Sequence, residues 1–205
     1  MAQQGVLLVE GADDFHVLSA LFQIHRIPNR FQIHKADGID RLLESIPVRI
    51  KSSVVERFAV VVDADEDLQQ RWNQVRGQLI ASGCREVPDF PIRSGTVLQV
   101  PDGPLVGAWL MPDNLIPGAL ESFLSFLVPD RDLLLPRVDA FLKDIPEEIR
   151  LTPPSRQPKS RIHSWLALQE EPGKPLGQAI TAKYLDARTE IVQPFLDWIR
   201  KMFID

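Results

Sequence analysis

Short apolar runs alternate with amphipathic segments over roughly the first 110 residues of the chain. The short runs are rich in Val, Ile, Leu and Phe, which is typical of buried strands, and the segments between them repeat apolar residues at helical spacing. We predict strands at 6–10, 31–34, 58–62, 96–100 and 106–111, and helices at 13–24, 39–46 and 68–82. This order predicts an α/β fold, with a mostly parallel sheet flanked by helices.

The chain changes character near residue 150. Prolines gather there, and proline favours turns because it fixes φ and lacks an N–H donor; they are Pro146, Pro153, Pro154 and Pro158. We predict an α/β domain over 1–150, and a Pro-rich connection with C-terminal helices packed on that domain over 151–205. The last predicted helix carries an apolar stripe, which would serve as a homodimer surface if the helix protruded.

Composition excludes several classes of protein. Lys and Arg number 23 against 28 Asp and Glu, and this net charge of −5 excludes a general basic nucleic-acid coat protein. Cys84 is the single cysteine, so an internal disulfide and a cysteine zinc site are excluded. The sequence has no apolar run of the roughly 18 residues that a membrane span needs, and its first residues lack the pattern of a signal peptide. We therefore expect a cytoplasmic protein with no membrane partner.

Acidic residues follow two of the predicted strands. Glu10 ends the first strand, and Asp63, Asp65 and Asp67 form a D-x-D-x-D run directly after the third. Ligands gather at the carboxyl ends of strands in open parallel sheets, and Mg²⁺ prefers hard oxygen ligands of this kind. The alternative is that the run is a solvated helix N-terminus, where acids interact favourably with the helix dipole. Asp14 allows two interpretations in the same way, as a helix cap or as a partner of Glu10.

This arrangement resembles the TOPRIM domain of topoisomerases, bacterial primases, small RNA-processing nucleases and OLD-family nucleases. Glu10 matches the glutamate after the first strand of that domain, and Asp63 and Asp65 match its D-x-D after the third strand. Asp67 matches a third acid that many members have. The resemblance covers roughly residues 5–112 and implies a TOPRIM-like fold with a bound Mg²⁺ or Mn²⁺.

Further residues resemble the OLD-type pattern. Asp14 resembles its second acid, four residues after the glutamate, while Asp113 and Glu121 resemble acids that follow the last strand. A nuclease also needs a cation near the charge that develops on the phosphate; Lys159 resembles a late lysine of these nucleases and precedes a helix that we predict to begin at Ser160. A solvated basic loop is the alternative for Lys159. The resemblance thus implies metal ligands at Glu10, Asp14, Asp63, Asp65, Asp67, Asp113 and Glu121, with Glu10 and Lys159 as catalytic groups.

The whole chain also resembles a small stand-alone TOPRIM-like family of bacteria that has a short helical C-terminal part and no established activity. Two departures from the larger families matter. The chain lacks the ATPase attached to OLD nucleases, so an ATPase or another partner would act in trans, and its one tyrosine, Tyr184, lies in a polar tail unlike a topoisomerase domain.

Three functional hypotheses follow. The first is a Mg²⁺- or Mn²⁺-dependent nuclease or phosphotransfer enzyme that acts on DNA or RNA. The second is a non-catalytic TOPRIM-like module that binds a metal, a nucleotide or a protein. The third, ranked last, is a domain like that of response regulators, which would need a strand-end lysine that the sequence does not supply after 106–111.

Overall fold

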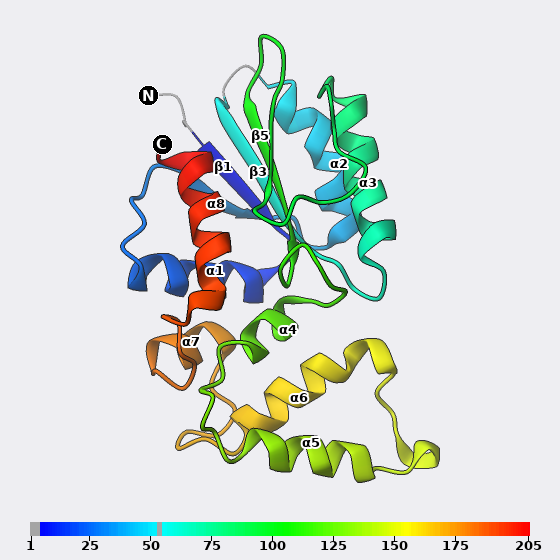
Figure 1. Cartoon of the computed structure of the whole chain (residues 1–205), viewed down its shortest axis with the longest axis vertical. Coiled ribbons are helices and arrows are strands. Elements are labelled where there is room, and N and C mark those ends of the chain that lie inside the picture. The colour runs from blue at the N-terminus through cyan, green and yellow to red at the C-terminus, as the bar shows by residue number, and fades with distance from the viewer. Residues whose placement is uncertain (1–4, 53–54) are drawn as a thin grey trace.

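The computed structural model describes residues 5–52 and 55–205 (Figure 1). Residues 1–4, which bear on the expected absence of a signal peptide, lie outside the described residues. The strands are β1 (Gly5–Val9), β2 (Gln32–Lys35), β3 (Arg57–Asp63), β4 (Thr96–Gln99) and β5 (Leu105–Met111). The α-helices are α1 (Ala12–Ile24), α2 (Ile39–Ile50), α3 (Leu68–Ala81), α4 (Leu120–Ser125), α5 (Leu135–Asp144), α6 (Gln157–Leu166), α7 (Leu176–Thr181) and α8 (Gln193–Phe203). Short 3₁₀ turns occur at Glu147–Ile149, Pro154–Arg156 and Glu190–Val192.

The five strands form one sheet in the order β2-β1-β3-β5-β4. All neighbouring strands are parallel except β4, which pairs antiparallel with β5 at the edge. This confirms the predicted fold class, a mostly parallel sheet flanked by helices. Since β1 and β3 are parallel neighbours with Val9 opposite Val61, the residues that follow both strands emerge at the same edge of the sheet.

Two apolar cores cover the two faces of the sheet. Alternate residues of a strand point to opposite faces, so Val6 and Leu8 pack with α2 and α3, whereas Leu7 and Val9 pack with α1 and α8. Figure 1 shows these two helix pairs on either side of the strands. Because both of their faces are buried, the central strands β1, β3 and β5 are almost continuously apolar, as the FAVVV run of β3 illustrates.

Two predicted helix boundaries were wrong. The second helix continues past 46 to Ile50, through Pro47, because Ile50 extends the buried stripe of Leu42 and Ile46. The helix expected to begin at Ser160 begins three residues earlier, at Gln157. Proline is well tolerated in the first turn of a helix, and here it stands at 158.

The C-terminal helix α8 packs on the sheet. Its apolar stripe is buried, and the indole of Trp198 donates to the carbonyl of Thr96 on β4. Gly107 on β5 makes room for the helix, because a Cβ there would lie 2.6 Å from the sulfur of Met202. The stripe is therefore not a free dimer surface, and a homodimer through another surface stays a prediction.

Four further helices lie beyond the carboxyl ends of the strands (Figure 1). Helix α6 packs on α4 and α5, and α7 packs on α1. The helices α5 and α6 stand on either side of the predicted division at residue 150, which stays a prediction. Among the described residues, no helix has both the length and the apolar character that crossing a membrane would require.

Candidate metal centre

Glu10 and Asp63 meet at the carboxyl edge of the sheet. Glu10 directly follows β1, and its carboxylate accepts a hydrogen bond of 2.8 Å from the backbone N–H of Asp63 at the end of β3. The carboxylate of Asp63 in turn accepts from the backbone N–H of Leu120, the first residue of α4, at 2.9 Å. These two acids therefore join β1, β3 and α4 at one point.

Asp14 and Glu121 bring two more carboxylates to the same region. Asp14 lies in the first turn of α1 and accepts from the backbone N–H of Gly11 at 3.0 Å, and Glu121 lies in the first turn of α4. Each side chain is mostly withdrawn from solvent, since both residues are only 8% exposed. We call Glu10, Asp14, Asp63 and Glu121 the acidic cluster.

Burial and the charges of neighbouring acids raise the pKa of Glu10, Asp14 and Asp63. Burial raises the pKa of Glu10 to about 7, with a further rise from Asp14, against the lowering effect of the Asp63 N–H donor. Burial likewise raises the pKa of Asp14 to about 6, aided by Glu121. The pKa of Asp63 lies well above its ordinary value because of burial and then the charges of Glu10, Asp14 and Glu121. A cation at this edge would offset the cost of ionising these groups.

Asp65 lies near the end of β3, and its side chain is turned towards an arginine. Its backbone N–H donates to the carbonyl of Gly118 at 2.8 Å, its φ is 53°, and its carboxylate forms an ion pair with Arg71. Arg71 also donates from Nε to the Asp63 carbonyl at 3.0 Å, and its charge lowers the pKa of Glu10. Sequence reasoning missed Arg71. The available signal was its place in the first turns of the helix after the acidic run, from which a long side chain reaches back to the strand end.

Lys159 reaches the acidic cluster from α6. Its Nζ lies 3.4 Å from a carboxylate oxygen of Glu121, because α6 packs on α4. The side chain of Lys159 is 55% exposed, so this ion pair adds little to stability. The lysine thus lies beside the acids and remains open to solvent.

Asp67 and Asp113 have local contacts. Asp67 caps α3 by accepting from the backbone N–H of Gln70 at 2.9 Å. Asp113 accepts from the backbone N–H groups of Leu115 and Ile116 in the loop after β5, at 2.9 and 3.1 Å. Aspartates that form turns and caps make contacts of this kind. The contact of Asp67 matches the alternative interpretation, in which the acidic run is the N-terminus of a helix. The roles of Asp67 and Asp113 as metal ligands stay predictions.

The donor set suits a magnesium or manganese ion only in part. Within residues 5–52 and 55–205, no three His, Cys, Asp or Glu side chains are grouped so that they could hold a metal ion together. Glu10 is engaged by a backbone N–H and Asp65 by Arg71. Mg²⁺, however, needs only one or two direct carboxylates and otherwise keeps its waters. The described residues therefore do not fit a closed protein cage, and a hydrated ion at Glu10 and Asp63 stays a prediction.

A polar cavity lies next to Asp65. It has a volume of about 360 Å³ and lies between the start of α3 and the turn that contains Ser155. Asp65, Glu66, Arg71 and Gln74 contribute to its lining. None of the four acids of the acidic cluster lines this cavity.

The raised pKa of Glu10 predicts how stability depends on pH without metal. Because the folded protein holds the Glu10 proton more tightly than the unfolded chain does, its free energy of unfolding should fall as pH rises from about 4.5 to about 7. Glu10→Gln should remove about 2 kcal/mol of that fall, by the linkage between pKa and stability. Urea denaturation in EDTA between about pH 5 and pH 8 measures it.

Glu66→Gln is the matched control, because Glu66 is exposed and lies in the same acidic run. It should leave the pH dependence of the wild type unchanged. If the free energy of unfolding of Glu10→Gln depended on pH as steeply as that of the wild type, the raised pKa of Glu10 would be contradicted.

The comparison with known proteins places the chain in a family. No curated protein and no solved structure matches it. One family model matches residues 4–204, which is nearly the whole chain, and its description is "Protein of unknown function (DUF3226)". The chain therefore belongs to the DUF3226 family.

Proposed function

We propose that this protein is a TOPRIM-like enzyme that uses Mg²⁺ or Mn²⁺ to cleave phosphodiester bonds of DNA or RNA. The observation that carries the proposal is that Glu10 and Asp63 lie together at the carboxyl ends of two adjacent parallel strands, with Asp14 and Glu121 close enough for their charges to raise the pKa of Asp63. Keeping such carboxylates ionised together costs stability unless positive charge offsets them. The positions of Glu10 after β1 and of Asp63 at the end of β3 also resemble those of the TOPRIM acids.

Each residue has a distinct task in this proposal. Glu10 and Asp63 hold the ion through their free oxygens, and Asp14 and Glu121 add negative charge around it. When bound, the metal would polarise a phosphoryl oxygen and lower the pKa of a bound water. Lys159, exposed beside Glu121, would bind the phosphate and stabilise the charge that develops on it.

A second function is a non-catalytic module that binds metal, nucleotide or protein. One observation favours it: the described carboxylates do not form a group of three around a common point, and Arg71 already neutralises Asp65. A module of this type would bind a metal without cleaving a phosphodiester. The experiments below separate the two functions.

Asp63→Asn tests the metal site. The amide keeps an oxygen that can accept from the Leu120 N–H, so the fold should persist, but the charge is lost. We expect Mn²⁺ affinity to fall at least tenfold in calorimetric titration, in line with the loss of a metal-site group. Metal-dependent cleavage of single-stranded DNA, supercoiled DNA and RNA should disappear with it. The melting temperature in EDTA should rise, because repulsion is relieved.

Glu66→Gln again serves as the control and should bind and cleave like the wild type. If Asp63→Asn bound Mn²⁺ with the affinity of the wild type, the proposed metal site would be contradicted. Mn²⁺ binding by the wild type without cleavage of any of the three substrates would favour the binding module.

Lys159→Ala tests the phosphate contact separately from the metal. At saturating Mn²⁺ the cleavage rate should fall about a hundredfold, the size of effect that follows loss of one charge-stabilising donor. Mn²⁺ affinity should stay within about twofold of the wild type, because lysine cannot ligate the ion while protonated. Lys201→Ala on α8, also an exposed lysine, is the control. Cleavage at the wild-type rate in Lys159→Ala would reduce Lys159 to surface charge.

A further inference from the structure

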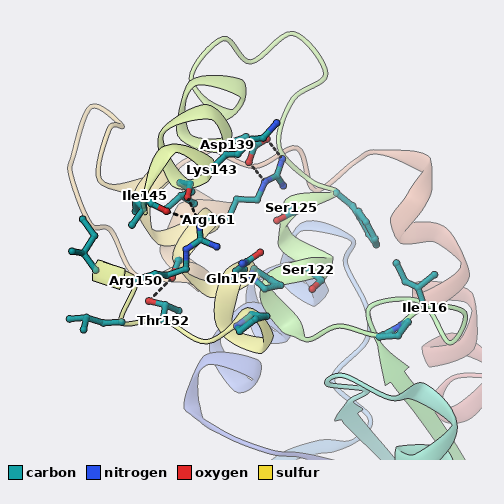
Figure 2. A pocket seen from close by; sticks show the side chains of 18 residues that line it. Ile116, Ser122, Ser125, Asp139, Lys143, Ile145, Arg150, Thr152, Gln157 and Arg161 are labelled. Carbon is teal, nitrogen blue, oxygen red and sulfur yellow. Dashed lines mark hydrogen bonds and ion pairs between the residues drawn. The ribbon is translucent and has the colours of Figure 1, made fainter. Parts of the chain in front are cut away.

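A cavity of about 830 Å³ lies among the helices beyond the sheet (Figure 2). Helices α4, α5 and α6 and the chain between α5 and α6 form its walls. Apolar side chains, among them Phe126, Leu142 and Ile145, supply most of the lining. The volume lies within the range of sites for small ligands, which are mostly apolar with a few polar groups. We call this cavity the helical pocket.

Ion pairs and hydrogen bonds fix the walls of the helical pocket. Arg161 on α6 forms a two-pronged pair with Asp139 on α5, at 2.5 and 2.9 Å. Arg150 donates to the carbonyl of Ile145 at 2.8 Å and to that of Leu142 at 3.4 Å, which joins the connecting chain to the end of α5. Figure 2 shows these contacts around the pocket. The pocket is therefore formed before any ligand enters.

The helical pocket adjoins the acidic cluster through shared elements. Glu121 and Lys159 meet at the cluster, and the residues that follow them, Ser122 and Ser160, line the pocket. Pro117 also lines it and precedes Gly118, whose carbonyl accepts from the Asp65 N–H. A chain-like ligand at the acidic cluster would thus have the pocket beside it.

The charge around the pocket favours an anionic ligand. Three basic residues, Lys143, Arg150 and Arg161, line the pocket against a single acid, Asp139, which pairs with Arg161. Gln157 lines the pocket and is exposed, so its side-chain amide is accessible to a ligand. An amide supplies one donor and one acceptor side by side, which matches the edge of a nucleobase.

We propose that the helical pocket receives one unstacked base of a single-stranded nucleic acid whose backbone passes the acidic cluster. This inference rests on the proposed function and specifies the form of the nucleic-acid substrate, which is a single strand. The apolar walls suit the flat face of a base, Gln157 suits its edge, and the basic residues suit the neighbouring phosphates. Bases of an intact duplex are stacked and paired, so a duplex cannot place one in the pocket without unpairing it.

A DNA oligonucleotide with one 2-aminopurine in its centre provides the test, because the fluorescence of this base changes when it leaves the stack. Titrations of the full chain are made in Ca²⁺, with the oligonucleotide single-stranded, with its duplex, and with single-stranded RNA of the same sequence. We expect single strands to bind at least tenfold more tightly than the duplex and to change fluorescence on binding. The DNA and RNA arms show which backbone is preferred.

Leu142→Trp narrows the pocket, and Gln157→Leu removes the exposed amide with little risk to folding. Each should weaken single-strand binding about tenfold, the order of one base contact, and reduce the fluorescence change. Phe141→Trp is the matched control for the first, because Phe141 neighbours Leu142 but is exposed outside the lining. Gln178→Leu on α7 is the control for the second. Melting temperatures establish that each variant is folded.

Several results would overturn the inference. Equal affinity for duplex and single strand would do so, as would wild-type binding by a folded Gln157→Leu. Absence of oligonucleotide binding, combined with concentration-dependent self-association that Leu142→Trp abolishes, would overturn it and assign the apolar walls to a contact between protein chains.

The two proposals can fail separately. Hydrolysis of bis(p-nitrophenyl) phosphate by the wild type in Mn²⁺ reports the acidic cluster alone, because this small diester has no base. If the diester is hydrolysed and the oligonucleotide test fails, the pocket inference is wrong and the proposed function stands. If the diester is untouched and the pocket variants weaken single-strand binding, the pocket inference stands, the proposed cleavage activity is wrong and the protein is a binding module.

Discussion

The parallel pairing of β1 with β3 places the Glu10 carboxylate against the backbone N–H of Asp63, and the candidate site is built around this contact. Both strands are buried on both faces, so their ends cannot shift without disturbing the two apolar cores. Asp63 then holds the first turn of α4 through the Leu120 N–H, and α4 carries Glu121. One backbone register therefore determines where three of the carboxylates lie.

The electrostatic balance at this point follows from the same packing. Burial makes ionisation of Glu10 and Asp14 costly, and the protein supplies only limited compensation. Arg71 neutralises Asp65 and contributes to Glu10, while Lys159 contacts Glu121 from an exposed position. A divalent ion would offset this cost, since its charge would act at short range in a poorly solvated place.

The sequence predicts the central strands well because β1, β3 and β5 are almost continuously apolar. It also predicts that Glu10 and Asp63 share an edge, because parallel strands release their carboxyl ends together. It does not predict that Asp65 turns to Arg71, since that choice depends on the Gly118 contact from a distant loop. Nor does it distinguish a capping role for Asp67 from a metal-binding one, because both place an acid before a helix.

The arrangement of helices α4, α5, α6 and α7 is the hardest part of the fold to predict from sequence. These helices are short, and their arrangement depends on long-range pairs such as Arg161 with Asp139. The early start of α6 places Lys159 within its first turn, and packing of α6 on α4 brings that lysine to Glu121. The helical pocket arises from the same packing, so no sequence motif predicts it.

Anomalous X-ray scattering from crystals of the protein soaked in Mn²⁺ tests the proposed metal site directly. We predict a manganese peak at the carboxyl edge of the sheet, ligated by Glu10 and Asp63. Peaks confined to Asp67, Asp113 or the protein surface, with none at Glu10 and Asp63, would contradict it.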